Sequence, residues 1–136
     1  MTGKRIVTPG TTGEFNAKIQ GHPDLAVNSI NVSFSGGNLH ISAREGDFFN
    51  FRSLYLIFKL DESNKTLTFD RLLYIGESET TSGFAKLRSE LTTAKTFNID
   101  FDVEKGTYKG SFNGVIPTEV GGERDILCSF DLLSTP

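Results

Sequence analysis

Residues of the types that most often do chemistry are sparse here: the 136-residue sequence holds two histidines and one cysteine. His22 precedes Pro23 in a turn, and His40 lies between Leu39 and Ile41, so its side chain is expected on the polar face of a strand. Zinc sites need clustered ligands at short spacing, such as HxH or HExxH, and the sequence has neither. We therefore predict two solvent-facing histidines and no metal site.

The single cysteine, Cys128, falls in the same alternate register as Ile126 and Phe130. A nucleophilic thiol needs a lowered pKa and a nearby base, and the sequence indicates neither. Cys128 is therefore expected to be a buried small hydrophobe. One cysteine cannot form an intrachain disulfide, so it favours neither an oxidising nor a reducing compartment.

Three aspartates, Asp100, Asp102 and Asp131, are expected on the polar faces of neighbouring strands. Paired carboxylates can serve glycoside hydrolysis or bind Ca²⁺, but this spacing matches no calcium loop of the EF-hand type. Their simplest role is to keep a sheet soluble. Because no set of acid, base and nucleophile converges, the sequence predicts a non-catalytic protein without cofactor.

The candidate binding residues are three aromatic ones, Phe48, Phe49 and Phe51, which follow a polar loop at residues 44–47. Aromatic side chains gathered at such a point could form an exposed rim for a ligand or a partner. The alternative is that they pack into the core.

β-Strands must position these residues, because apolar and polar side chains alternate with a period of two through much of the chain. Phe97, Ile99 and Phe101 alternate with polar residues, as do the apolar residues of the segments that follow. Gly110 and Gly114 fall in an apolar register, where they either leave room for a facing layer or relax a curved strand. The expected strands are residues 14–20, 26–34, 38–43, 48–60, 66–75, 97–103, 107–116 and 125–133.

The segment 48–60 departs from simple alternation. Its apolar residues change parity near Arg52 and Ser53, which predicts a bulge or a break there. Tyr55 and Ile57 are apolar on the face opposite the main set, and a strand that is apolar on both faces is usually covered on both. A short helix near 84–94, with apolar residues at i, i+3 and i+7, could supply that cover; a strand is the alternative there.

The predicted fold is all-β, with eight or nine mostly antiparallel strands in a two-sheet sandwich; the alternative is a lipocalin-like barrel. Residues 1–13, rich in Thr and Gly, are expected to form a flexible N-terminal arm, and residues 14–136 a single β domain.

Charge and hydropathy narrow the possible partners and compartments. The net charge is -3 and dispersed, without the basic patch that nucleic-acid binding normally needs. No apolar run approaches the ~20 residues of a membrane span. The start lacks the apolar region of a signal peptide, so the chain as written is expected in the cytoplasm. It would be secreted or periplasmic if it is a processed fragment.

Two local patterns are familiar together: FNAKIQG at 15–21 and GTYKGSFNGVI at 106–116, the latter followed by a strand containing SFDL. They resemble the small uncharacterised β-domains of many bacterial surface or periplasmic proteins, which share F-x-A-x-I-x-G and G-x-Y-x-G-x-F-x-G patterns. The matching positions are Phe15, Ala17, Ile19, Gly21, Gly106, Tyr108, Gly110, Phe112 and Gly114. The resemblance implies a β-sandwich or barrel and no activity.

The sequence thus predicts a binding or interaction module whose partner is an unknown protein or a small apolar or carbohydrate ligand. The alternative is a β-barrel that holds a small apolar ligand, which would require an apolar interior pocket open at one end.

Overall fold

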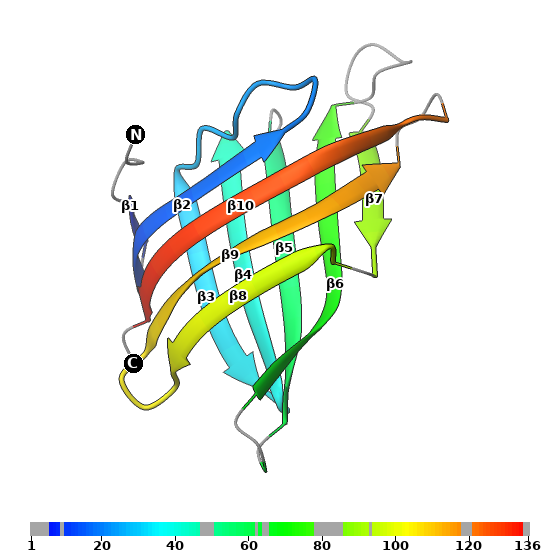
Figure 1. Cartoon of the computed structure of the whole chain (residues 1–136). Helices are drawn as coiled ribbons and strands as arrows, with labels where there is room; N and C mark the ends of the chain where they lie inside the picture. Colours follow the sequence, from blue (N-terminus) through cyan, green and yellow to red (C-terminus); the bar gives the residue numbers. More distant parts are fainter. Residues whose placement is uncertain are drawn as a thin grey trace.

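Two antiparallel β-sheets face each other in the computed structural model of the chain (Figure 1). The structure describes residues 6–8, 10–46, 51–61, 63, 66–77, 86–92, 94–117 and 121–134, without the side chains of 7, 8, 77 and 86–89. In spatial order, sheet A contains β1 (Ile6–Thr8), β2 (Thr11–Ile19), β10 (Glu123–Ser134), β9 (Thr107–Pro117) and β8 (Thr96–Asp102). Sheet B contains β3 (Ser29–Ser35), β4 (Asn38–Gly46), β5 (Phe51–Asp61), β6 (Thr66–Glu77) and β7 (Lys86–Leu91).

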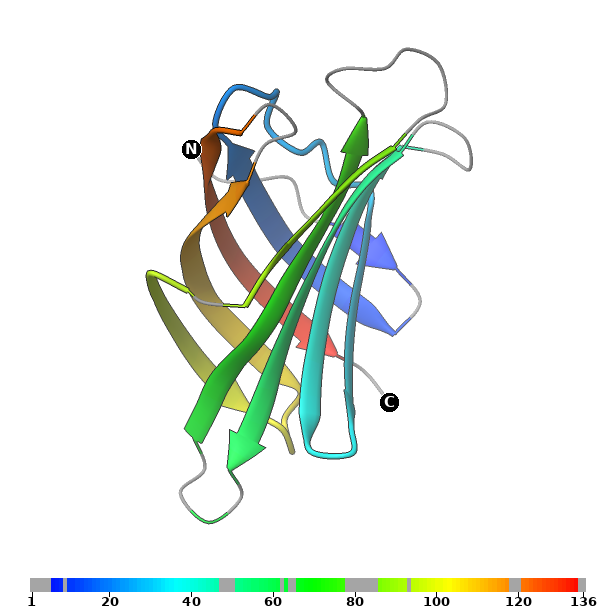
Figure 2. The ribbon, with the colours of Figure 1, turned by 90° about the vertical axis from the view of Figure 1, so that its right-hand side faces the viewer.

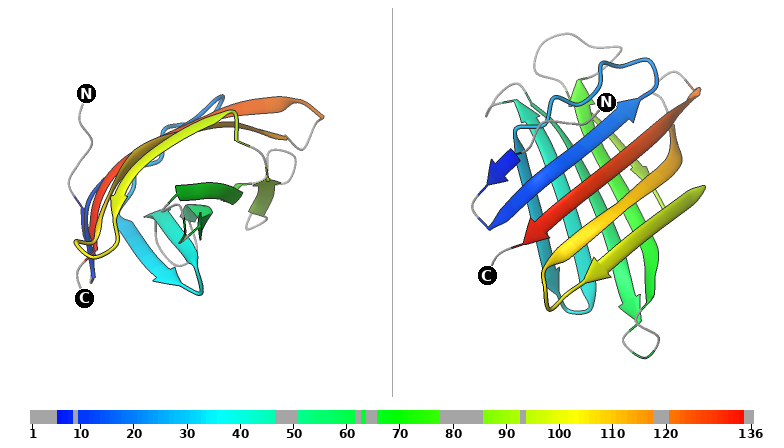
Figure 3. Two further views of the ribbon diagram at one scale, coloured as in Figure 1. Left: turned by 60° about the horizontal axis from the view of Figure 1, so that its bottom comes forward. Right: turned by 60° about the vertical axis from the view of Figure 1, so that its left-hand side comes forward.

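The sheets form the predicted two-sheet sandwich. The strands of sheet A cross those of sheet B obliquely (Figure 1), and sheet A curves over sheet B (Figures 2 and 3). No strand pairing among the described residues joins one sheet to the other, so the sheets do not close and the barrel alternative is wrong.

The core lies between the sheets because alternate residues of the long strands point inward. In β10, Ile126, Cys128, Phe130 and Leu132 are buried while the residues between them are exposed. Phe130 stacks on Phe15 of β2 with ring centroids 5.9 Å apart. The predicted burial of Cys128 is confirmed, and this burial raises the pKa of its thiol.

The short helix considered near 84–94 is wrong, because residues 86–91 form β7 at the edge of sheet B. Leu91 pairs with Leu72 of β6, and both side chains are buried. Strand pairing thus places Leu91 in the core between the sheets. A helix on the outer face of sheet B could not bring Leu91 to that position. Among the described residues, no helix is long and apolar enough to cross a membrane.

The predicted flexible arm, residues 1–13, is wrong for the part that the structure describes. Ile6–Thr8 form β1, and β2 already begins at Thr11. The Thr11 hydroxyl accepts a hydrogen bond of 3.2 Å from the Val32 backbone N–H, which links sheet A to sheet B. With β1 and β7 included, the described residues form ten strands rather than eight or nine.

The break predicted near Arg52 and Ser53 is also absent, because β5 is continuous there. The parity change has another cause. Phe51 lies on the outer face, where the Arg44 guanidinium sits 4.1 Å from its ring centroid, a cation–π contact. The register between β5 and β6 shifts further on, between Ile57 and Phe58, and the extra residue there, Asp70, belongs to β6.

Gly110 and Gly114 of β9 lack side chains for different reasons. A Cβ on Gly110 would overlap the backbone carbonyl oxygen of Asn98 on β8, so glycine there permits the curvature of sheet A. A Cβ on Gly114 would lie 3.0 Å from the Leu91 side chain of sheet B and 3.0 Å from the Phe112 ring. Gly114 therefore leaves room for the facing layer.

These surroundings predict unequal responses to alanine. Gly110→Ala should lower the free energy of unfolding by about 2 kcal/mol or more, because backbone atoms must move. Gly114→Ala should change it by less than about 1 kcal/mol, because the Leu91 side chain can shift. Urea unfolding of both variants measures the difference. Equal losses would show that Gly110 has no special role in the curvature.

Candidate functional site

A stripe of apolar side chains lies on the outer face of sheet B, directed away from sheet A. It consists of Phe51, Tyr55 and Ile57 on β5 with Leu73 and Ile75 on β6, and we call it the outer stripe. Tyr55 is paired with Leu73, and Ile57 and Ile75 flank that pair. The Tyr55 side chain is 37% exposed, and the other four are half-buried.

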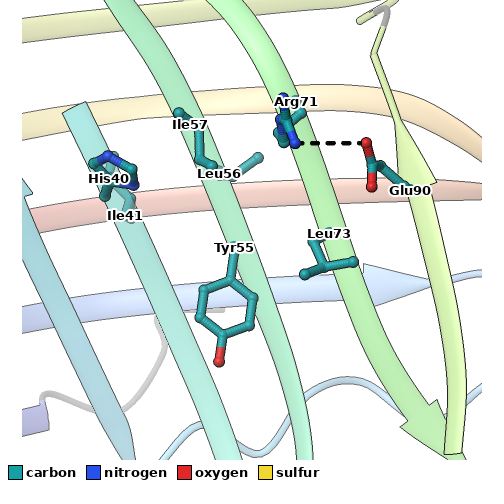
Figure 4. A pocket seen from close by; sticks show the side chains of 8 residues that line it. All are labelled: His40, Ile41, Tyr55, Leu56, Ile57, Arg71, Leu73 and Glu90. Carbon is teal, nitrogen blue, oxygen red and sulfur yellow. Dashed lines mark ion pairs between the residues drawn. The ribbon is translucent and has the colours of Figure 1, made fainter. Parts of the chain in front are cut away.

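The middle of the outer stripe forms a shallow depression of about 220 Å³ (Figure 4). Tyr55, Ile57 and Leu73 contribute its apolar side chains, and His40 of β4 lies at one side. At the other side, Arg71 of β6 faces Glu90 of β7, with 3.8 Å between Nη1 and Oε1. The depression therefore combines an apolar centre with a polar and charged rim.

The rim charges are held loosely. The Arg71 Nε also donates to the Asp70 carboxylate at 3.2 Å, and Arg71 and Glu90 are both well exposed. Exposed ion pairs contribute at most about 1 kcal/mol to folding stability. Arg71 and Glu90 can therefore exchange partners at little cost when another molecule approaches.

From the sequence, we expected the segment near 84–94 to form a helix that covers the outer face of Tyr55 and Ile57. Residues 86–91 of that segment lie in sheet B itself, as β7 beside β6, so these residues do not cover the face. The predicted candidate residues are only partly described. Phe51 lies in the outer stripe, whereas Phe48 and Phe49 lie outside the described residues, so a rim made by all three stays a prediction.

A second cluster, of charged and polar groups, closes one end of the core. Arg52 points inward from β5. Its guanidinium donates hydrogen bonds to the backbone carbonyls of Pro23 (2.8 Å) and Asp24 (3.0 Å). It also donates two hydrogen bonds to the Glu45 carboxylate, of 2.8 and 2.7 Å. Glu45 also accepts from the Ala26 backbone N–H at 2.7 Å. Arg52 and Glu45 together anchor residues 23–26, part of the connection from sheet A to sheet B.

The pKa shifts of these groups follow from their contacts. The hydrogen bond to Arg52 lowers the pKa of Glu45, and the same bond raises the pKa of Arg52.

His22 and Tyr74 form a second pair in this cluster, with 3.2 Å between the His22 Nδ1 and the Tyr74 hydroxyl. Burial lowers the His22 pKa, and the positive charges of Arg124 and Arg52 lower it further. Burial raises the pKa of Tyr74. Near neutral pH, His22 and Tyr74 are thus uncharged and support the connection by hydrogen bonding.

The predicted carboxylates lie on the outer face of sheet A. Pairing across four strands aligns Glu14, Asp131, Lys109 and Asp100 in one row, beside a second row of Asn and Ser. These rows line a wide polar groove of about 630 Å³. In the described part of the chain, no group of three or more His, Cys, Asp or Glu side chains could hold a metal ion.

Comparison with known proteins adds no relative: no protein-family model, curated protein or solved structure matches this chain. The resemblance to bacterial surface β-domains therefore stays a prediction.

Sequence reasoning missed Leu73 and Ile75 as candidate surface residues, and it missed the Arg52–Glu45 pair. The first two had a signal, since residues 72–75 are apolar at four successive positions. For the pair, the signal was an arginine at an inward position of a strand that is otherwise apolar on that side. Such an arginine needs a carboxylate partner.

The lowered pKa of His22 predicts a pH-dependent stability. The unfolded chain binds a proton at His22 below about pH 6.5, whereas the folded protein resists it, so stability should fall as the pH drops through 6.5. The window from about pH 7.5 to about 5.5 isolates this effect, since Glu45, with its lowered pKa, titrates below it.

His22→Gln should therefore reduce the loss of stability between these two pH values, as measured by urea unfolding. His40→Gln is the matched control, because His40 lies on the opposite face of sheet B from Arg52. The pH dependence would not come from His22 if His40→Gln reduced the loss of stability and His22→Gln did not.

Proposed function

We propose that this protein is a non-catalytic interaction module that binds a partner protein through the outer stripe of sheet B. The observation that carries the proposal is the group of neighbouring apolar side chains on the outer face of β5 and β6, of which Tyr55 is exposed and Ile57, Leu73 and Ile75 are half-buried. Single exposed apolar residues are ordinary, but contiguous ones rimmed by polar groups are typical of binding sites.

The size of the depression favours a protein partner over a small ligand. Small-molecule pockets usually measure about 300–1,000 Å³ and enclose most of the ligand. The depression around Tyr55 holds about 220 Å³ and is open, which suits one side chain projecting from a partner's surface. An apolar or aromatic anchor fits best, because Tyr55, Ile57 and Leu73 contribute its apolar side chains.

The composition of the stripe and its rim also supports a protein partner. Protein interfaces combine an apolar centre with a polar rim, and tyrosine and arginine are enriched among the residues that contribute most to affinity. Tyr55 lies centrally, with Arg71 and Glu90 on one side and His40 on the other. Side chains such as Phe58 pack between the sheets in the described part of the chain, which favours a surface ligand over an interior one.

The test starts with a photoreactive benzoyl-phenylalanine placed at position 55 or, as a control, at position 127, in the cells that naturally make the protein. Leu127 is 47% exposed on the outer face of sheet A. Irradiation should cross-link one partner protein from position 55 and not from position 127. The partner is then purified for binary titrations.

In those titrations, Tyr55→Arg and Leu73→Arg should each raise the dissociation constant by about tenfold or more, since each removes apolar contact at the centre. Leu127→Arg is the matched control and should bind like the wild type. Circular dichroism and urea unfolding show that all three variants fold. The proposal fails if position 55 yields no cross-link, or if the stripe variants bind as tightly as the control.

A further inference from the structure

The edge strands of the two sheets are protected unequally against pairing with other chains. Exposed edges usually carry charge, are very short, or are covered. β1 has three residues, and it contacts β3, the edge strand of sheet B on that side. β7, the other edge of sheet B, has Lys86, Arg88 and Glu90 in its sequence. The remaining edge, β8, carries two aspartates but no basic residue, has seven residues, and pairs on its free side with no other strand of the described residues.

β8 (Thr96–Asp102) has the sequence TFNIDFD, without Lys, Arg or Pro. Its pairing with β9 is regular from Thr96 to Asp102, with no bulge. No described strand pairs with its other side, and Figure 1 shows it as the last strand of sheet A. β8 thus presents a regular row of backbone N–H and C=O groups, which is the template that an added strand requires.

The inner face at this edge is apolar and only partly covered. Phe97, Ile99 and Phe101 point toward sheet B but are half-buried. The Phe97 ring lies 5.5 Å from Phe58 and 6.4 Å from Phe69, between centroids, and Phe69 of β6 is itself half-buried. Figures 1 and 2 show the β5–β6 end of sheet B extending beyond β8. Another strand beside β8 would therefore bury apolar surface of both sheets.

The outer face at this edge is acidic. Asp100 is exposed at the end of the row formed with Lys109, Asp131 and Glu14, which holds three carboxylates and one amino group. Side chains directly opposite on paired strands interact, and opposite charges stabilise the pair. An added strand is therefore favoured if it places Lys or Arg opposite Asp100.

We propose that β8 accepts an extended segment of a partner protein as a sixth strand of sheet A, with alternating apolar residues inward and basic residues outward. A second copy of the chain fits less well, because its own β8 would bring aspartates rather than basic residues to the edge that carries Asp100 and Asp102. This surface lies on another sheet from the outer stripe, so the proposal does not rest on the proposed function.

The first experiment uses two fluorescein-labelled synthetic peptides, KVKVKVK and EVEVEVE, titrated with the full chain at about 0.15 M salt, where surface charges are screened beyond about 8 Å. The basic peptide should bind about tenfold more tightly than the acidic one. Asp100→Lys should remove or reverse this preference. Asp131→Lys is the matched control. Asp131 lies on β10, which β9 separates from β8, so this variant should largely keep the preference for the basic peptide.

The second experiment tests backbone pairing. Two versions of the basic peptide carry N-methyl groups on alternate residues, one on the odd and one on the even positions. Only alternate N–H groups of an added strand face β8, so one version should lose binding and the other should keep it. Hydrogen exchange should slow at β8 amides when the unmodified peptide binds.

Three results would overturn the proposal. The first is equal binding by both methylated versions, since that indicates charge attraction alone. The second is no binding of the basic peptide at about 1 mM, the weak end of specific association. The third is a free protein whose β8 amides gain protection as its own concentration rises, since that indicates a second copy as the occupant.

Discussion

Burial of alternate side chains between the two sheets is the interaction on which the rest of this structure depends. Each large apolar side chain moved from water into the core contributes about 1.5–3 kcal/mol, against a backbone ordering cost of about 1–2 kcal/mol per residue. Inward residues such as Phe112, Phe58 and Tyr74, each almost fully buried, must therefore offset the ordering of their outward neighbours. The same alternation fixes which residues remain outside and available for binding.

β5 and β6 depart from that alternation in a way that gives the molecule its candidate site. Their inward residues, Leu54, Leu56 and Leu72, are fully buried, so the core does not need Tyr55, Ile57 or Leu73. Apolar side chains on the second face of a sheet contribute little to folding while they face water. A binding role for the outer stripe accounts for their presence, and the open rim ion pair between Arg71 and Glu90 is compatible with it.

Much of the fold could be predicted from local pattern, because a period of two depends only on neighbouring residues. The alternation around Phe97 and Cys128 gave the strands and their inward faces correctly. The errors arose where partners distant in sequence decide the outcome. Leu91 is in a strand because β6 and Gly114 surround it, and Phe51 is outward because Arg44 lies over its ring. Arg52 points inward because Glu45 and two loop carbonyls satisfy its guanidinium.

The solvent exposure of the outer stripe can be measured by methyl relaxation in the presence of a soluble nitroxide. Ile57 and Leu73 on the outer face can be compared with Ile41 and Leu56, which are buried on the inner face of the same sheet. The nitroxide should accelerate relaxation of the Ile57 and Leu73 methyl groups several-fold more than that of the Ile41 and Leu56 methyl groups. Equal protection of all four residues would contradict this prediction, because the outer stripe would then be covered in the protein itself.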